Sequence, residues 1–575
     1  MPQSITLAFV ANSKDVIWAT NYSQFHPQEK MKLFPTHIPA LLYLLKLHPK
    51  SIHRIDTYVK RHHNLQSALS LPLTLAQQLV ASNSHLRLLT EVFRAEFTKA
   101  LSHYYILHQI TRQTYCSKII ISPSSLSLQA TRQFIQDFNL DYEVIPPPST
   151  SILRQLQRKF SVYLEPLRWL LTHPQELFPF LGQFLPTRTP SKAAILIFSN
   201  GLNLASYHSV IKALTRYTSV KIITDQQGFK DKLYLSKYGI RGQQLRSNST
   251  SLQGTVNKKI NLATLKSTPW FISLNGLKQL TRTLASWVIS RNGGKILAKY
   301  IQAQQLIVKF RPRLVITTHD PGPSGLSFVA AAQARKIKTL VLVHGAPSGI
   351  HYFYSDYQLI WGKLMRRLLI KTGLSKHRLK LGGHPIYADY KKYFMSHLSK
   401  STSLTIGILT TGDGKYEWHQ TLYFWDLFLA LKPLKNHRLL VRTHGMQNLE
   451  LLNQLAHHFG LKINLNPPLH LEEFVAQSDV IITQNSTAAL VPLIAHKPTI
   501  LFDPWFPFLD EGLIKSSPAL FKPSSIKQLS YLIHQITAGR LQRNLFKIQD
   551  HFIDQFCGPL DPQMGERIAR QIRSL

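Results

Sequence analysis

A chain of 575 residues is too long for a single hydrophobic core, and its length predicts about three to four domains. Its hydrophobic content of 44%, with 10% aromatic residues, excludes disorder on a large scale. Lys and Arg number 68 against 29 Asp and Glu, a net charge of +39. This charge favours an anionic partner (a nucleotide diphosphate, an acidic lipid surface or nucleic acid), although a solvated basic surface has the same composition. No Lys/Arg run interleaved with aromatic residues and no nucleic-acid motif occurs, which argues against nucleic acid.

The two cysteines, Cys116 and Cys557, cannot form a disulfide framework or a Cys-based zinc site, which fits a reducing cytosol. The first residues, MPQSITLAFVANSKD, lack the basic segment and the apolar length of a signal peptide. No run of about 18 apolar residues occurs, so a spanning helix is not expected. The expected location is the cytoplasm, with the inner face of the cell membrane as a peripheral site.

Residues 1–155 are expected to form an N-terminal α/β accessory module. Its apolar runs predict strands at 5–10, 117–121 and 142–145 and helices at 38–47, 75–113 and 129–139. The β-α-β order indicates a small Rossmann-like fold. No residues in this module suggest a particular chemistry.

Residues 156–191 form an amphipathic, Pro-rich connector between proline-rich breaks. Arg158 and Lys159 lie near its start, and Trp169, Phe178 and Phe180 lie further along. Such a segment can rest on an anionic membrane with its aromatic side chains inserted. It can equally pack its apolar face on a neighbouring domain.

A second α/β unit is expected over residues 192–385. Its β-branched runs predict buried parallel strands with crossover helices, the strands falling at 193–198, 220–224, 314–317, 339–343 and 358–361. Two of these strands end in a histidine beside small residues, at His319-Asp320 and at His344-Gly345. Ligands of open α/β sheets bind outside the carboxyl ends of the strands. We therefore expect both loops to face one crevice, which we interpret as the active site.

A third α/β unit is expected over residues 403–575, after an interdomain link at 386–402. Strands are predicted at 404–409, 438–442, 463–465, 479–483 and 498–502, with a helix at 488–495. The loop after the first of these strands contains Gly412 and Gly414, whose backbone N–H groups could approach a phosphate. The same Gly-Asp-Gly pattern is also ordinary turn chemistry.

The strand at 479–483 leads through Asn485, Ser486 and Thr487 into the predicted helix. A helix start with two hydroxyl groups offers unpaired N–H donors and a partial positive charge, which together suit an anion. Arg442 and His444 end a strand expected nearby and could neutralise a diphosphate. The alternative is that these polar side chains only cap the helix.

Several motifs resemble those of the GT-B glycosyltransferases, which have two Rossmann-like domains, and in particular the branch of CDP-glycerol glycerophosphotransferases, capsular polysaccharide transferases and related CMP-sugar-using enzymes. These motifs are the loop 343–347, similar to that branch's HG-type loop; 356–362; 382–389, similar to its G-x-P-x-x-D link; Arg442-Thr443-His444; and 479–487 followed by Lys497-Pro498. The resemblance covers residues 192–575. The chain departs from it at Gly445, where the motif has proline, and near Val491, where retaining relatives have an acidic residue. The paired acidic motifs of a sugar-nucleotide epimerase are not evident.

The resemblance implies a GT-B-like fold with an added N-terminal module. It implies a transferase that moves a glycosyl or polyol-phosphate group from a CDP-, CMP- or UDP-linked donor to a glycan or lipid-linked acceptor, in cell-surface polysaccharide or glycolipid synthesis. We expect an inverting reaction without a metal or other cofactor. The expected roles are base for His344, with Asp320 as its rival; donor binding for Arg442, His444, Ser486, Thr487, Gly412 and Gly414; and support of the cleft for His319, Gly345 and Asn485.

Two other classes remain open. One is a non-catalytic GT-B-like protein that binds a nucleotide or a polyanion. The other is a basic factor that binds a membrane surface or nucleic acid, for which salt-dependent retention on DNA without nucleotide-sugar binding would be diagnostic.

Overall fold

The computed structural model describes about half of the chain. Its residues are 5–10, 16, 18–19, 23, 30–35, 40–41, 103, 107, 110, 116–121, 131–132, 135, 140–145, 193–199, 204, 206–224, 243–244, 296, 298–318, 323–345, 354–371, 374–397, 404–410, 417–434, 437–443, 449–467, 469–484, 486–502, 517–540 and 544–575. The connector expected at 156–191 lies outside these ranges, so its membrane role stays a prediction.

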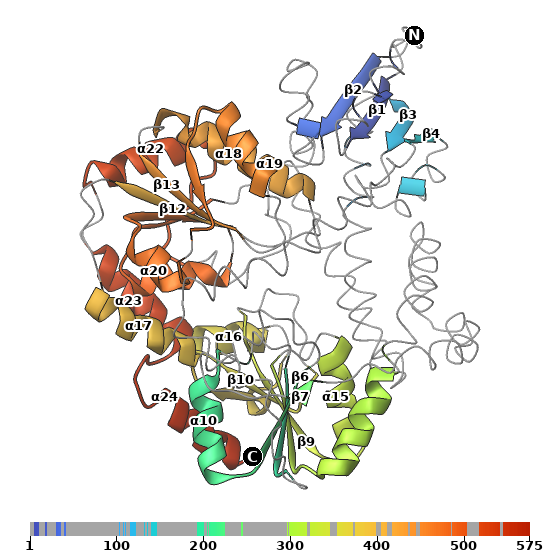
Figure 1. Ribbon diagram of the computed structural model, residues 1–575, viewed down its shortest axis with the longest axis vertical. Coiled ribbons are helices and arrows are strands. Elements are labelled where there is room, and N and C mark those ends of the chain that lie inside the picture. The colour runs from blue at the N-terminus through green and yellow to red at the C-terminus, as the bar shows by residue number, and fades with distance from the viewer. Residues whose placement is uncertain are drawn as a thin grey trace.

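Three parallel sheets make up the described strands (Figure 1). Their strand orders are β2-β1-β3-β4, β11-β10-β9-β8-β5-β6-β7 and β14-β13-β12-β15-β16. Parallel strands that are covered on both faces read as near-continuous hydrophobic runs, as the sequence does here. The predicted α/β class with Rossmann-like parallel sheets is confirmed.

The first sheet contains β1 (Ile5–Val10), β2 (Lys30–Pro35), β3 (Cys116–Ile121) and β4 (Asp141–Val144). Three of these strands were predicted. The predicted strands did not include β2, whose KMKLFP run holds two lysines and a proline. Because β2 lies at the edge of the sheet, these residues are tolerated there.

The second sheet has seven strands, and its helices cover it from both faces. The strands are β5 (Ile195–Ser199), β6 (Val220–Thr224), β7 (Gln243–Gln244), β8 (Leu314–Thr317), β9 (Lys338–Leu342), β10 (Tyr357–Ile360) and β11 (Leu379–Leu381). The helices are α10 (His208–Tyr217), α15 (Pro323–Gln333) and α16 (Lys363–Lys371), with a further helical stretch at 298–310. In α10 the buried residues Val210, Ile211, Ala213 and Leu214 follow helical spacing and face the core.

The third sheet has five strands: β12 (Thr405–Leu409), β13 (Arg438–Arg442), β14 (Ile463–Leu465), β15 (Val480–Thr483) and β16 (Thr499–Leu501). It is accompanied by α18 (Glu417–Leu431), α19 (Leu449–His458), α20 (Leu471–Ala476), α21 (Leu490–Ile494) and α22 (Ile526–Thr537). Leu409 pairs with Arg442 on one side and with Thr483 on the other, so three strands end level with one another. Their following loops therefore leave the sheet at one edge.

The helix predicted at 488–495 consists of a 3-10 turn, η7 (Thr487–Ala489), and the short α21. Pro492 is the third residue of α21, where its missing N–H donor costs no helical hydrogen bond. The core of this sheet and that of the first sheet belong to one hydrophobic cluster, which includes Phe9 and Ile408.

The segment expected as a link, 386–402, contains most of helix α17 (Pro385–His397). Two helices follow the third sheet, α23 (Leu545–Cys557) and α24 (Met564–Arg573). Figure 1 shows α17 and α23 between the second and third sheets, and α24 beside α10. Arg216 of α10 pairs with Glu566 of α24 at 2.6 Å. The last helix of the chain therefore packs on the second sheet and ties the two halves together.

Within the part of the chain that the structure describes, no helix is both long and apolar enough to cross a membrane.

Candidate functional site

His344 lies two residues after the end of β9, and the neighbouring strand β8 orients its ring. Nδ1 of His344 is 2.8 Å from the carbonyl oxygen of Thr318, the first residue after β8. A carbonyl oxygen only accepts a hydrogen bond, so Nδ1 carries the proton and Nε2 carries the lone pair. Burial lowers the pKa of His344 below its usual 6.5, and the bond to the Thr318 carbonyl partly offsets this. The ring is therefore neutral at pH 7 with a defined tautomer.

A group of buried aromatic side chains lies behind His344. The carbonyl of Val343 accepts hydrogen bonds from the Tyr207 hydroxyl at 2.6 Å and from Trp361 Nε1 at 2.5 Å. His384, fully enclosed, has its ring centroid 4.9 Å from that of Tyr207 and 4.7 Å from that of Trp361. These contacts fix the peptide that carries the His344 side chain.

Arg442 ends β13 and Ser486 follows β15, two strands of the third sheet that flank β12. Arg442 donates from Nη1 to the carbonyl of Leu469 at 2.6 Å. Ser486 Oγ accepts the N–H of Ala488 at 3.2 Å, so this hydroxyl caps the short turn η7 as the alternative interpretation held. The level ends of the strands nevertheless place Arg442, Ser486 and Thr487 at the carboxyl edge of the third sheet.

The loops that follow β9 and β15 meet each other. A Cβ atom placed on Gly345 would lie 4.0 Å from Thr487 Oγ1, an ordinary van der Waals distance. Gly345 is adjacent to His344, and Thr487 follows Ser486. The structure therefore brings Gly345, which follows the second sheet, close to Thr487, which follows the third.

The remaining expected site residues lie outside the described ranges: Asp320, His319, His444, Asn485, Gly412 and Gly414. Their roles stay predictions. Among the residues with described positions, no three His, Cys, Asp or Glu side chains group as metal ligands would.

The sequence did not predict the aromatic group of Tyr207, Trp361 and His384 behind His344. One signal was present, because Trp361 and His384 follow adjacent strands, β10 and β11, at the same edge as His344. Tyr207 carries no such signal, since it precedes α10 and reaches Val343 only through the tertiary fold.

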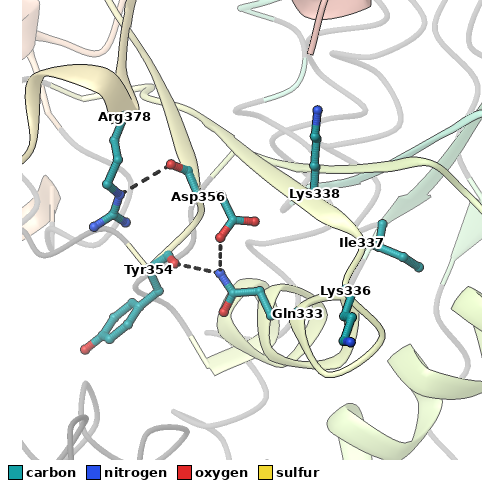
Figure 2. Close-up of a pocket in the computed structure, with 7 residues that line it drawn as sticks. All are labelled: Gln333, Lys336, Ile337, Lys338, Tyr354, Asp356 and Arg378. Carbon is teal, nitrogen blue, oxygen red and sulfur yellow. Dashed lines mark hydrogen bonds between the residues drawn. The ribbon is translucent and has the colours of Figure 1, made fainter.

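A cavity of about 520 Å³ lies elsewhere on the second sheet (Figure 2). It is lined by Gln333, Lys336, Ile337, Lys338, Tyr354, Asp356 and Arg378. Lys338 begins β9 and Asp356 directly precedes β10, so this cavity lies at the amino edge of the strands, opposite His344. Asp356 Oδ2 accepts hydrogen bonds from the N–H and hydroxyl of Thr339 at 2.9 and 2.8 Å, and Figure 2 shows Gln333 Nε2 bonded to its other oxygen. Asp356 thus joins the starts of two strands and is not part of the expected crevice.

The geometry defines a parallel α/β protein in which two Rossmann-like sheets bring strand-end loops together. No protein-family model matches the chain, and no curated protein matches it. Its structure is similar to UDP-GlcNAc 2-epimerase from Neisseria meningitidis bound to UDP-GlcNAc, at 10% identity and a TM-score of 0.45, over 66% of this chain and 99% of that one. It is also similar to the S. aureus MnaA–UDP co-structure (15% identity, TM-score 0.44, 66% and 95% covered) and to Anabaena Alr3699/HepE in complex with UDP and glucose (12%, 0.42, 67% and 100%).

Proposed function

We propose that the chain is a GT-B-type transferase that moves a glycosyl or polyol-phosphate group from a nucleotide-activated donor to an acceptor hydroxyl. The observation that carries the proposal is the approach of Gly345 to Thr487, which joins a neutral, oriented histidine to a hydroxyl-bearing strand end on the other sheet. Two of the motifs that suggested the class, 343–347 and 479–487, include these loops.

In the proposed reaction the acceptor oxygen attacks the donor carbon or phosphorus. A new bond to that atom forms, its bond to the nucleotide oxygen breaks, and the electron pair leaves with the nucleotide. The acceptor proton moves to Nε2 of His344, the nitrogen that holds the lone pair. The Thr318 carbonyl, bonded to Nδ1–H, stabilises the imidazolium that forms, in the way that a third group supports a nucleophile–base pair. The attack is in line, so a sugar carbon would be inverted, and no step passes through a metal ion.

Arg442 supplies positive charge for the leaving nucleotide in this proposal. A guanidinium has five N–H donors, and one of them is used on the Leu469 carbonyl. That bond holds the side chain at the strand end while other donors are available for phosphate oxygens. Ser486 and Thr487 add hydroxyl groups at the same edge of the sheet.

The donor in this proposal is CDP-, CMP- or UDP-linked, and the acceptor is a glycan or lipid-linked hydroxyl in polysaccharide or glycolipid synthesis at the cell surface. The charge of +39 supports a location at the anionic inner face of the cell membrane, since basic surfaces are attracted to acidic lipids.

The test combines a thermal-shift screen of CDP-, CMP-, UDP- and GDP-linked donors with a transfer assay on the donor that raises the melting temperature most. His344→Ala should abolish transfer and keep the shift, whereas Arg442→Ala should reduce the shift. His458→Ala, an exposed histidine of α19, is the matched control and should behave as wild type. Full activity of His344→Ala would refute the base assignment. A nucleotide-induced shift without transfer or donor hydrolysis would instead indicate a binding protein.

A further inference from the structure

His384 is a buried histidine whose chemistry the proposed reaction does not use. It is only 2% exposed and lies between Gly383, which has a φ of +91°, and the start of α17. The rings of Tyr207, Trp361 and Tyr387 surround it, with centroids 4.7 to 4.9 Å away. Its Nδ1 atom has no hydrogen-bond partner among the described residues. A phenylalanine would fill this space without burying an unpaired nitrogen, so packing alone does not account for a histidine here.

The side chains that enclose His384 also bond to the residue before His344. Two of its aromatic walls, Tyr207 and Trp361, donate to the carbonyl of Val343, the residue before His344. Burial is the dominant cause of the low pKa of His384. His384 therefore contacts both of the side chains that donate to the Val343 carbonyl.

We propose that His384 is a positioning residue that acts through Tyr207 and Trp361 on the Val343–His344 peptide, so that the His344 ring keeps its bond to Thr318 and presents Nε2 to the acceptor. The proposal rests on the proposed function for the role of His344 as the base. Burial lowers the pKa of His384 to about 3, so this ring stays neutral and acts through its position and not by proton transfer.

Two measurements on His384→Phe test the role, because phenylalanine keeps an aromatic side chain here but differs from imidazole in shape and has no ring nitrogens. The first is the tautomer of His344 by NMR of the full chain labelled with ¹⁵N-histidine, in which the His344 signals are those absent from His344→Ala. The second is kcat and KM for transfer. The control is His458→Phe, at an exposed histidine that contacts Phe459 with a centroid distance of 5.3 Å.

In the wild type and the control, the His344 signals should show a single tautomer with the proton on Nδ1. In His384→Phe we expect a mixture of tautomers and a fall in kcat of about 10-fold or more with little change in KM, since small misplacements of a catalytic group cost that much. The melting temperature should change little, because the removal of an unpaired buried nitrogen offsets the larger volume of the phenyl ring. A wild-type tautomer in His384→Phe would overturn the proposal.

Two further outcomes distinguish a failure of the proposed function from a failure of the role proposed for His384. If the wild type transfers nothing, the proposed function fails, and the NMR measurement still decides whether His384 positions His344. If His384→Phe does not fold, Tyr207→Phe removes one of the two donors to the Val343 carbonyl and keeps the ring. It should show the same mixture of tautomers, and an unchanged tautomer there would also overturn the proposal.

Discussion

Gly362 marks the closest contact between the second sheet and the C-terminal helices. A Cβ atom at Gly362 would lie 2.4 Å from the carbonyl oxygen of Gln555, 2.5 Å from that of Phe556 and 2.6 Å from the Phe556 carbonyl carbon. All three atoms belong to the backbone at the end of α23, so no side-chain rotation relieves the overlap. Non-bonded heavy atoms prefer separations of about 3.5 Å or more, and Gly362→Ala must therefore displace this helix end by on the order of 1 Å.

Overpacking of this kind costs typically about 1–3 kcal/mol, and contact with three backbone atoms places Gly362→Ala near the upper end, at about 3 kcal/mol. Gly460→Ala is the control. Gly460 has a φ of +74°, but apart from its chain neighbours no atom of the described residues lies within 4 Å of its Cβ position, so alanine there costs only the left-handed backbone strain of about 1–2 kcal/mol.

Cys557, the last residue of α23, reports on the displacement directly. Its side chain is buried, and burial raises the pKa of its thiol far above the usual value, so it should react very slowly with a thiol reagent in the wild type. In a Cys116→Ser background, Gly362→Ala should expose Cys557 to faster labelling and lower the urea midpoint, while Gly460→Ala should leave the labelling rate unchanged. A Gly362→Ala protein with the wild-type midpoint and a protected thiol would refute the close packing of these two segments.

Three other predictions concern His344, His384 and Ser486. Because His344 must be neutral to accept a proton and burial holds its pKa below 6.5, kcat/KM should be level between about pH 7 and 8 and fall only as the pH drops through that lowered pKa; a profile centred above 6.5 would contradict this. His384 has a folded pKa of about 3 against 6.5 when unfolded, so the unfolded chain binds the extra proton, and stability present above pH 6.5 should be lost on acidification by up to roughly 5 kcal/mol near pH 3. Urea midpoints at pH 7.5 and 5 should therefore differ less in His384→Phe than in the wild type, and equal differences would count against the buried neutral ring. Ser486→Ala should lower the stability of the chain by about 1 kcal/mol through loss of the bond to the Ala488 N–H, with Ser486→Thr as the capping control, and an unchanged melting temperature would show that the cap contributes nothing.

The local sequence was sufficient to predict the central strands and the order in which they follow one another along the chain. A strand buried on both faces is nearly all hydrophobic, as in the ILIFS run of β5 or the VIIT run of β15, and such runs are visible in the sequence. The three strands that the sequence analysis missed, β2, β7 and β11, all lie at sheet edges. Edge strands have one unpaired side and are short or charged, so they lack that signature.

The same reasoning placed His344 at a strand end, because the rule that ligands bind at the carboxyl edge needs only the strand and its direction. It could not decide how the neighbourhood of that histidine is built. The partner of its Nδ1 lies 26 residues away at Thr318, and the hydroxyl that holds Val343 comes from Tyr207, 136 residues away.

What the sequence by itself determined is the set of hydrophobic runs and the polar residues that end them. Only the tertiary structure decided which of those ends meet: Gly345 with Thr487, and the last helix with α10 through Arg216 and Glu566, 350 residues apart. The physical reason is that periodicity reports how each residue relates to its neighbours along the chain. Contacts between distant segments depend instead on how whole sheets and helices pack, and this is where the histidine, the hydroxyls and the aromatic enclosure are brought together.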